Sequence, residues 1–128
     1  MEQTKLMDAH VQVRRVYNLL GEVMDLSRQL AEAIDRNDQV SMQMILAMRE
    51  EPIRGILQAR EALQQQMNVS SPEDAKRLRE LLDGKPAANE QEAGIAKQVA
   101  ANIRLLKQVQ DIEQPLNRKI SRDKSPYH

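Results

Sequence analysis

The chain has 128 residues, enough for one domain, and its composition excludes several classes of protein. Aromatic residues make up only 2%, with no Phe and no Trp. This disfavours β-sandwiches and barrels, because those folds depend on aromatic and β-branched residues. There is no Cys, so disulfides and cysteine metal sites are excluded. The 19 basic residues balance 19 acidic ones, which disfavours a dedicated nucleic-acid-binding protein, because such proteins carry a basic excess.

A seven-residue repeat runs through the first 35 residues. The positions alternate between four and three residues apart over four heptads: Leu6, His10, Val13, Tyr17, Leu20, Met24, Ser27, Ala31 and Ile34. This spacing predicts one long amphipathic helix over residues 3–35, which needs a partner helix packed along it. The polar segment Asp35-Arg36-Asn37-Asp38 predicts a tight turn into an antiparallel helix, with Asp38 as the N-cap.

The middle of the chain contains two further helical patterns. Residues 39–67 are helical in pattern but contain Pro52, which removes a backbone donor and clashes with the preceding turn. We expect a kink or a break near residues 50–51, most simply one helix over 39–50 and another beginning at Pro52. Ser71 as N-cap, Pro72 at the first helical position and Gly84 just past the end predict a short helix over residues 72–82.

A last helix is predicted from about Asn89, because apolar residues recur three or four apart: Ile95, Val99, Ile103, Leu106, Val109 and Ile112. Pro115 is expected to interrupt it. Residues 116–128 contain four basic residues and one acidic residue, and we expect a basic, disordered tail outside a domain of residues 1–115. The predicted fold is an all-α, elongated antiparallel bundle of three long helices plus short ones.

The chain offers no pattern typical of an enzyme. His10 lies in the apolar stripe without a second His at ligand spacing, and we expect it to be packed or at a boundary. The glycines form no phosphate-binding loop either. Because none of these patterns is present, we expect no catalytic residue, no metal and no cofactor. No apolar run approaches the length of a membrane span, and no apolar segment of a signal peptide follows Met1-Glu2-Gln3. We therefore expect a cytoplasmic location, or else export by a route that needs no such signal.

Two apolar surfaces are candidate partner-binding sites. Met42, Met44 and Met48 crowd one stretch of the second helical pattern. Methionine suits surfaces that adapt to apolar partners, but a broad core face explains the same residues. In the last helix, the stripe of Val99, Ile103, Leu106, Val109 and Ile112, together with Asn102, either belongs to the core or docks on a partner. In the second case the link over residues 84–91 lets this helix move.

With these elements placed, the chain resembles the flagellar export chaperones of the FlgN kind. The resemblance rests on the long first helix leading into residues 30–38, on Met48-Arg49-Glu50-Glu51-Pro52-Ile53, on Asn102-Ile103-Arg104-Leu105-Leu106 and on Ser125-Pro126-Tyr127. It covers nearly the whole chain, although Pro52 and the separate helix over 72–82 depart from the family's layout.

The resemblance implies a non-catalytic cytoplasmic chaperone. Such proteins bind the terminal segments of hook-associated subunits, prevent their early assembly and deliver them to the export apparatus; related chaperones serve the filament cap. The last helix, with Val99, Asn102, Ile103, Leu106, Val109 and Ile112, and the three methionines are the expected partner-binding residues. The alternative is a coiled-coil structural or adaptor protein that self-associates as a homodimer through the first helix. Neither interpretation involves nucleic acid or membrane insertion.

Overall fold

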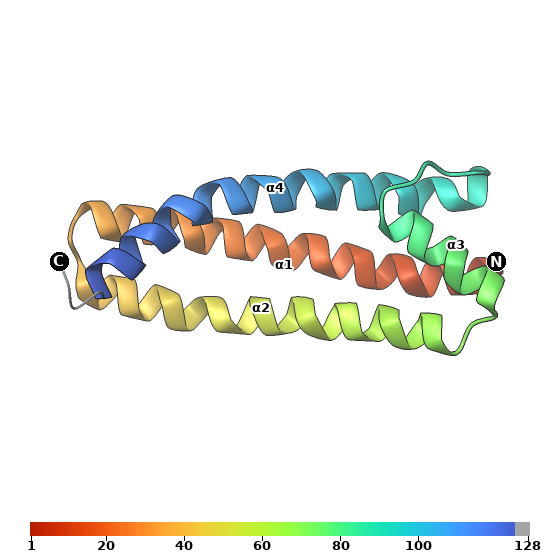
Figure 1. Ribbon diagram of the computed structural model, residues 1–128, viewed down its shortest axis with the longest axis horizontal. Helices are drawn as coiled ribbons and strands as arrows, with labels where there is room; N and C mark the ends of the chain where they lie inside the picture. Colours follow the sequence, from red (N-terminus) through yellow and green to blue (C-terminus); the bar gives the residue numbers. More distant parts are fainter. Residues whose placement is uncertain (125–128) are drawn as a thin grey trace.

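The computed structural model contains four helices: α1 (Gln3–Asp35), α2 (Gln39–Asn68), α3 (Pro72–Leu82) and α4 (Glu90–Lys124). It describes the backbone of residues 1–124 and the side chains of residues 1–120. The molecule is elongated, with α1 lying between α2 and α4 and the short α3 packed at the end where the chain begins (Figure 1). The predicted all-α bundle of three long helices and a short one is confirmed.

The helix ends follow local sequence signals. Asp38 caps α2, because its Oδ1 accepts a hydrogen bond from the Ser41 backbone N–H at 3.0 Å. The Ser41 hydroxyl also donates to this carboxylate, which holds the pKa of Asp38 below its usual range. Ser71 Oγ accepts from the Asp74 N–H at 3.2 Å, and Gly84 ends the α3 segment with a φ of 97°. The predicted turn and the predicted short helix are therefore confirmed.

The break expected near Pro52 is wrong, because α2 is one helix from Gln39 to Asn68. Pro52 is buried, as is Gly55 three residues later. A Cβ at position 55 would lie 2.8 Å from Leu19 Cδ1, so α2 passes very close to α1 here. Proline removes only one hydrogen bond, and packing along α1 outweighs that local loss.

The interruption expected at Pro115 is wrong for the same reason. α4 continues through Pro115 to Lys124, and Leu116 is buried against residues of α1 and α2. The proline itself is exposed, so its ring faces away from these contacts. Residues 116–124, expected to belong to a disordered tail, extend α4, whereas residues 125–128 of that tail lie outside the described residues.

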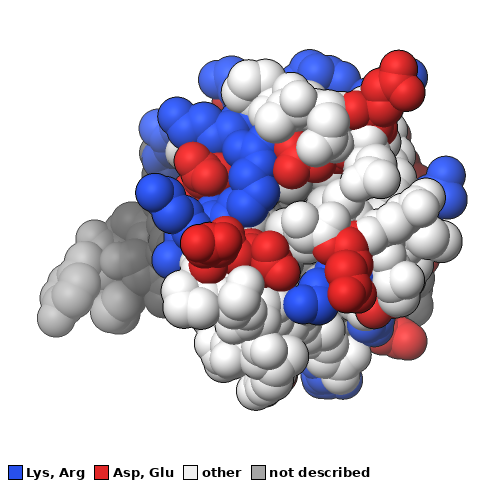
Figure 2. All heavy atoms as spheres, turned by 90° about the vertical axis from the view of Figure 1, so that its right-hand side faces the viewer, with Lys and Arg blue, Asp and Glu red and all other residues white. Residues whose placement is uncertain are grey.

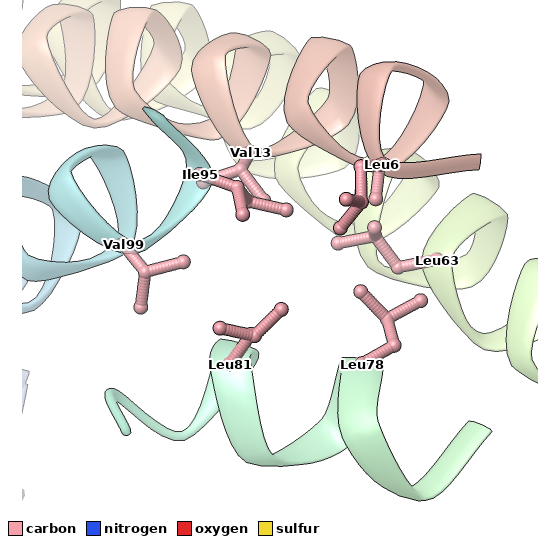
Figure 3. Packing of buried hydrophobic residues seen from close by; sticks show 8 residues of the cluster. Leu6, Val13, Leu63, Leu78, Leu81, Ile95 and Val99 are labelled. Carbon is pink, nitrogen blue, oxygen red and sulfur yellow. The ribbon is translucent and has the colours of Figure 1, made fainter. Parts of the chain in front are cut away.

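All four helices contribute to the core at the end that carries α3 (Figure 3). The side chains that point toward one another there are Leu6 and Val13 of α1, Leu63 of α2, Leu78 and Leu81 of α3, and Ile95 and Val99 of α4. Leu78 and Leu81 are almost completely buried. Burying such leucines stabilises the fold by about 1.5–3 kcal/mol each, which keeps the short α3 in place.

Two smaller clusters hold the rest of the bundle. At the opposite end, where α4 crosses α1 toward the start of α2, Leu30 and Ala33 pack with Ile45 and Leu116 (Figure 1). In the middle, Val23 and Met24 of α1 pack against Val109 of α4. The middle cluster contains no fully buried residue of α2, so the bundle is closed at both ends but less completely in between.

Candidate functional site

An apolar groove runs between α2 and α4, with α1 as its floor. Among the described residues, no Cα atom of α2 lies within 8 Å of one of α4. The resulting groove has a volume of about 470 Å³. Its floor is made by Val13, Val16, Leu20 and Val23 of α1. Its walls are Ile53, Ile56, Leu57, Arg60, Leu63 and Met67 of α2, and Val99, Asn102, Ile103, Leu106, Val109 and Glu113 of α4, with Leu82 at one end.

The outer parts of both walls are exposed apolar side chains. Leu57 of α2 is 58% exposed and Ile103 of α4 is 49% exposed, and Ile53 adds a third on the α2 side. Deeper in the groove, Val99 and Val109 are buried. Since exposed apolar surface arranged along one groove is a mark of binding sites, this feature is the candidate functional site.

One end of the groove is closed by α3. Leu82 lines the groove there, and a Cβ at Gly84 would lie 3.0 Å from Ile103 Cδ1, so the chain leaving α3 lies against the α4 wall. A partly buried ion pair fixes this arrangement: Arg77 Nε donates to Glu92 Oε2 at 3.0 Å, and Glu92 is 5% exposed. The Arg77 guanidinium, helped by the backbone N–H of Ala88, holds the pKa of Glu92 below its usual range despite burial.

Arg77 also donates to the Pro86 carbonyl at 3.0 Å. The link before α4, expected to let that helix move, is thus tied to α3. Arg77 is at the same time one of three basic residues of α3, which carries three acidic ones as well. Figure 2 shows this end of the molecule with Lys and Arg gathered on one side and acidic side chains among and beside them.

The other end of the groove is closed by a polar cluster that joins three helices. Arg49 of α2 forms a salt bridge with Glu113 of α4, and Ser27 of α1 donates to the same carboxylate at 3.0 Å. Ser27 is fully buried, and the Arg49 Nε atom is buried without a hydrogen-bond partner. Beyond this cluster the three helices meet in the closed core around Leu30.

The two remaining polar groups of the groove differ in their partners. Asn102 Nδ2 donates to the Val13 carbonyl at 2.8 Å, and Asn102 Oδ1 accepts from Gln98 Nε2 at 3.1 Å. The amide is therefore satisfied within the bundle and fastens α4 to α1. Arg60, by contrast, makes no salt bridge and no side-chain hydrogen bond within residues 1–120. It is the one charged group lining the described groove that is left without an ionic partner.

The structure brings most of the predicted α4 residues to the groove. Val99, Asn102, Ile103, Leu106 and Val109 all line it. Ile112 does not: it is partly buried and packs against the middle cluster and the far one. Burial varies within this stripe: Val99 and Val109 are buried, whereas Ile103, which lies between them, is exposed.

The predicted methionines do not join this site. Met42 packs against the closed core near the α1–α2 turn, whereas Met44 and Met48 are exposed. At about 100° per residue, Met48 points about 140° away from Ile53 around α2, so the exposed methionines lie outside the groove. His10 is partly buried beside Gly94, at a boundary position as expected.

Sequence reasoning missed the α2 wall and the residues that close the groove. Glu113 carried a signal, because it lies about five helical turns after Ile95 and so shares its face. Arg49 lies midway between Met42 and Ile56, one heptad from each and again on one face. Polar residues within an apolar stripe mark such clusters, although spacing alone does not identify their partners.

The chain matches no family model, no curated protein and no solved structure. The side chains of residues 1–120 form no group of three or more His, Asp or Glu arranged to share a metal ion. None of the four helices, as far as they are described, combines the length and apolar composition that crossing a membrane requires.

Proposed function

We propose that this protein is a non-catalytic flagellar export chaperone that binds hook-associated or filament-cap subunits in the cytoplasm, prevents their premature assembly and delivers them to the export gate. The observation that carries the proposal is the apolar groove between α2 and α4. Three helices surround it as three helices of a four-helix bundle surround the fourth, and the two closed ends hold its walls apart.

The groove has the properties that reversible capture of a subunit requires. Its rim exposes Leu57 and Ile103, which give apolar contact area, while its floor is held rigid by the core of α1. A preformed groove keeps the entropic cost of binding low, since only the client has to become ordered. The assembly segments of an export subunit are apolar and helical, and a groove of this kind covers them until they are delivered.

The direct test is titration calorimetry of the protein against a purified hook-associated protein and a purified filament-cap protein of the same organism. We expect one of the two to bind. The double variant Leu57→Asp with Ile103→Asp places a carboxylate on each wall and should weaken binding well over tenfold, because each apolar anchor contributes about 1.5–3 kcal/mol. Both side chains are largely exposed, so circular dichroism and the melting temperature should change little.

Met44→Asp is the matched control, since Met44 is 59% exposed but lies outside the groove. It should bind like wild type; a loss confined to this variant would move the binding surface to the methionines. Failure of the wild-type protein to bind either subunit would reject the chaperone assignment. If instead the wild type binds neither subunit and is a dimer in sedimentation equilibrium, the adaptor that self-associates through the first helix is the correct alternative.

A further inference from the structure

We infer that the groove holds a single amphipathic helix of about four turns, supplied by a partner and carrying a carboxylate beside Arg60. The inference rests on the proposed function in one respect, namely that the groove is where the partner binds. It adds the conformation, the length and the charge of the bound segment.

The conformation follows from the polar groups of the groove. An extended peptide would leave backbone N–H and C=O groups facing apolar walls, where each unpaired group is costly. The groove offers few partners for them: Asn102 is already satisfied, and Glu113 is engaged by Arg49 and Ser27. A helix satisfies its own backbone and presents only side chains, so it is the conformation that these walls accept.

The length follows from the two closed ends. The lining residues of α2 run from Ile53 to Met67, and those of α4 run from Val99 to Glu113. Each of these spans corresponds to about 21 Å at about 1.5 Å per residue, or about four turns. A longer straight helix would collide with α3 at one end or with the crossing α4 segment at the other (Figure 1).

The same limit excludes a second copy of this chain as the occupant. Its long helices have 33, 30 and 35 residues, about twice the length that the groove accommodates or more. The 11-residue α3 is short enough, but its apolar side chains Leu78 and Leu81 are already buried within its own bundle. The described part of the chain therefore contains no free helix of the right length.

The charge follows from Arg60. Its neighbours one turn away on the groove side are Ile56 and Leu63, and no acidic side chain of the described residues pairs with it. An apolar helix that covered this guanidinium would remove its water without supplying a hydrogen-bond partner. A carboxylate on that helix would instead form an ion pair with it where water is partly excluded. Charge complementarity thus favours an acidic residue toward the α3 end of the bound helix.

The test uses three lengths of synthetic amphipathic peptide, of about two, four and eight helical turns, kept helical by lactam bridges on the polar face. All share one apolar face and one Trp, and each length carries either a Glu or a Lys at the position opposite Arg60. The protein contains no Trp, so peptide fluorescence reports binding without background. We expect the four-turn Glu peptide to bind most tightly, and to exceed its Lys counterpart by about fivefold at low salt.

Arg60→Glu should reverse that charge preference and leave the length optimum unchanged. Arg54→Glu is the matched control, because Arg54 is exposed on the same helix but does not line the groove. Affinity that rises steadily up to the longest peptide, a charge preference indifferent to Arg60→Glu, or no binding by any peptide would each overturn the inference. Calorimetry with the intact subunits tests the proposed function separately from this inference, because a subunit can bind the groove through a segment that is not a four-turn helix.

Discussion

The two ends of this bundle and its middle are built from the same kinds of residues but differ in what covers them. Leu63 of α2 is 7% exposed, because it packs against α1 in the core completed by α3, whereas Leu57, less than two turns earlier but about 120° away around the helix, is 58% exposed. At the ends, a fourth segment or a crossing helix completes the packing. In the middle only three helices meet, and the apolar walls remain open. An apolar stripe thus becomes core or binding surface according to its neighbours.

The comparison is tested most severely by placing the same charge in the two regions. Leu81→Asp, at a position with no exposed surface, buries an unpaired carboxylate and should cost at least about 4 kcal/mol or abolish cooperative unfolding. Leu57→Asp should change the free energy of unfolding by less than about 1 kcal/mol, because its side chain is already largely in water. Urea denaturation followed by circular dichroism measures both. Equal losses would show that the middle is as tightly packed as the end.

The polar cluster at the boundary between groove and closed core gives an intermediate effect. Arg49→Met removes the partner of the partly buried Glu113 and should cost about 2–4 kcal/mol, whereas Arg49→Met with Glu113→Leu should recover most of that loss. A double-mutant cycle in urea provides the measurement. If the losses of the two single variants simply add, Arg49 and Glu113 do not stabilise each other.

Of the three destabilising changes, loss of the ion pair between α3 and α4 should have the smallest effect, and that effect should depend on pH. Glu92→Gln weakens the charged hydrogen bonds to Arg77 and should cost about 1–3 kcal/mol at pH 7. Because the pKa of Glu92 is lowered from 4.5 by folding, its contribution is fully present above that value and is lost as the pH falls below it. The difference in unfolding free energy between wild type and variant should therefore shrink between about pH 5 and pH 3.

Glu90→Gln serves as the control for this pH series, because Glu90 is exposed two residues earlier in the same helix. It should follow the wild type at every pH. A wild-type advantage over Glu92→Gln that stays constant down to about pH 3 would contradict the assignment of the ion pair as the source of the stability difference.

The sequence by itself determined the secondary structure where local chemistry is decisive. Local interactions account for the heptad spacing of α1, the Asp38 and Ser71 caps and the end of α3 at Gly84. Each depends on groups within a few residues of one another, so the sequence pattern was enough to predict it. The apolar stripe of α4 was also recognisable, and five of its six candidate residues line the groove.

The tertiary structure alone decided which signals prevail and which apolar residues stay exposed. Pro52 and Pro115 carry strong local signals for a break, but contacts with distant helices hold both helices together, and those contacts are invisible to a local pattern. Likewise, Leu57 and Leu63 are the same residue type on the same helix. Both line the groove, but Leu63 packs with residues of α1, α3 and α4 in the closed core, whereas Leu57, about 120° away around α2, stays largely exposed, because burial depends on what lies across from a side chain.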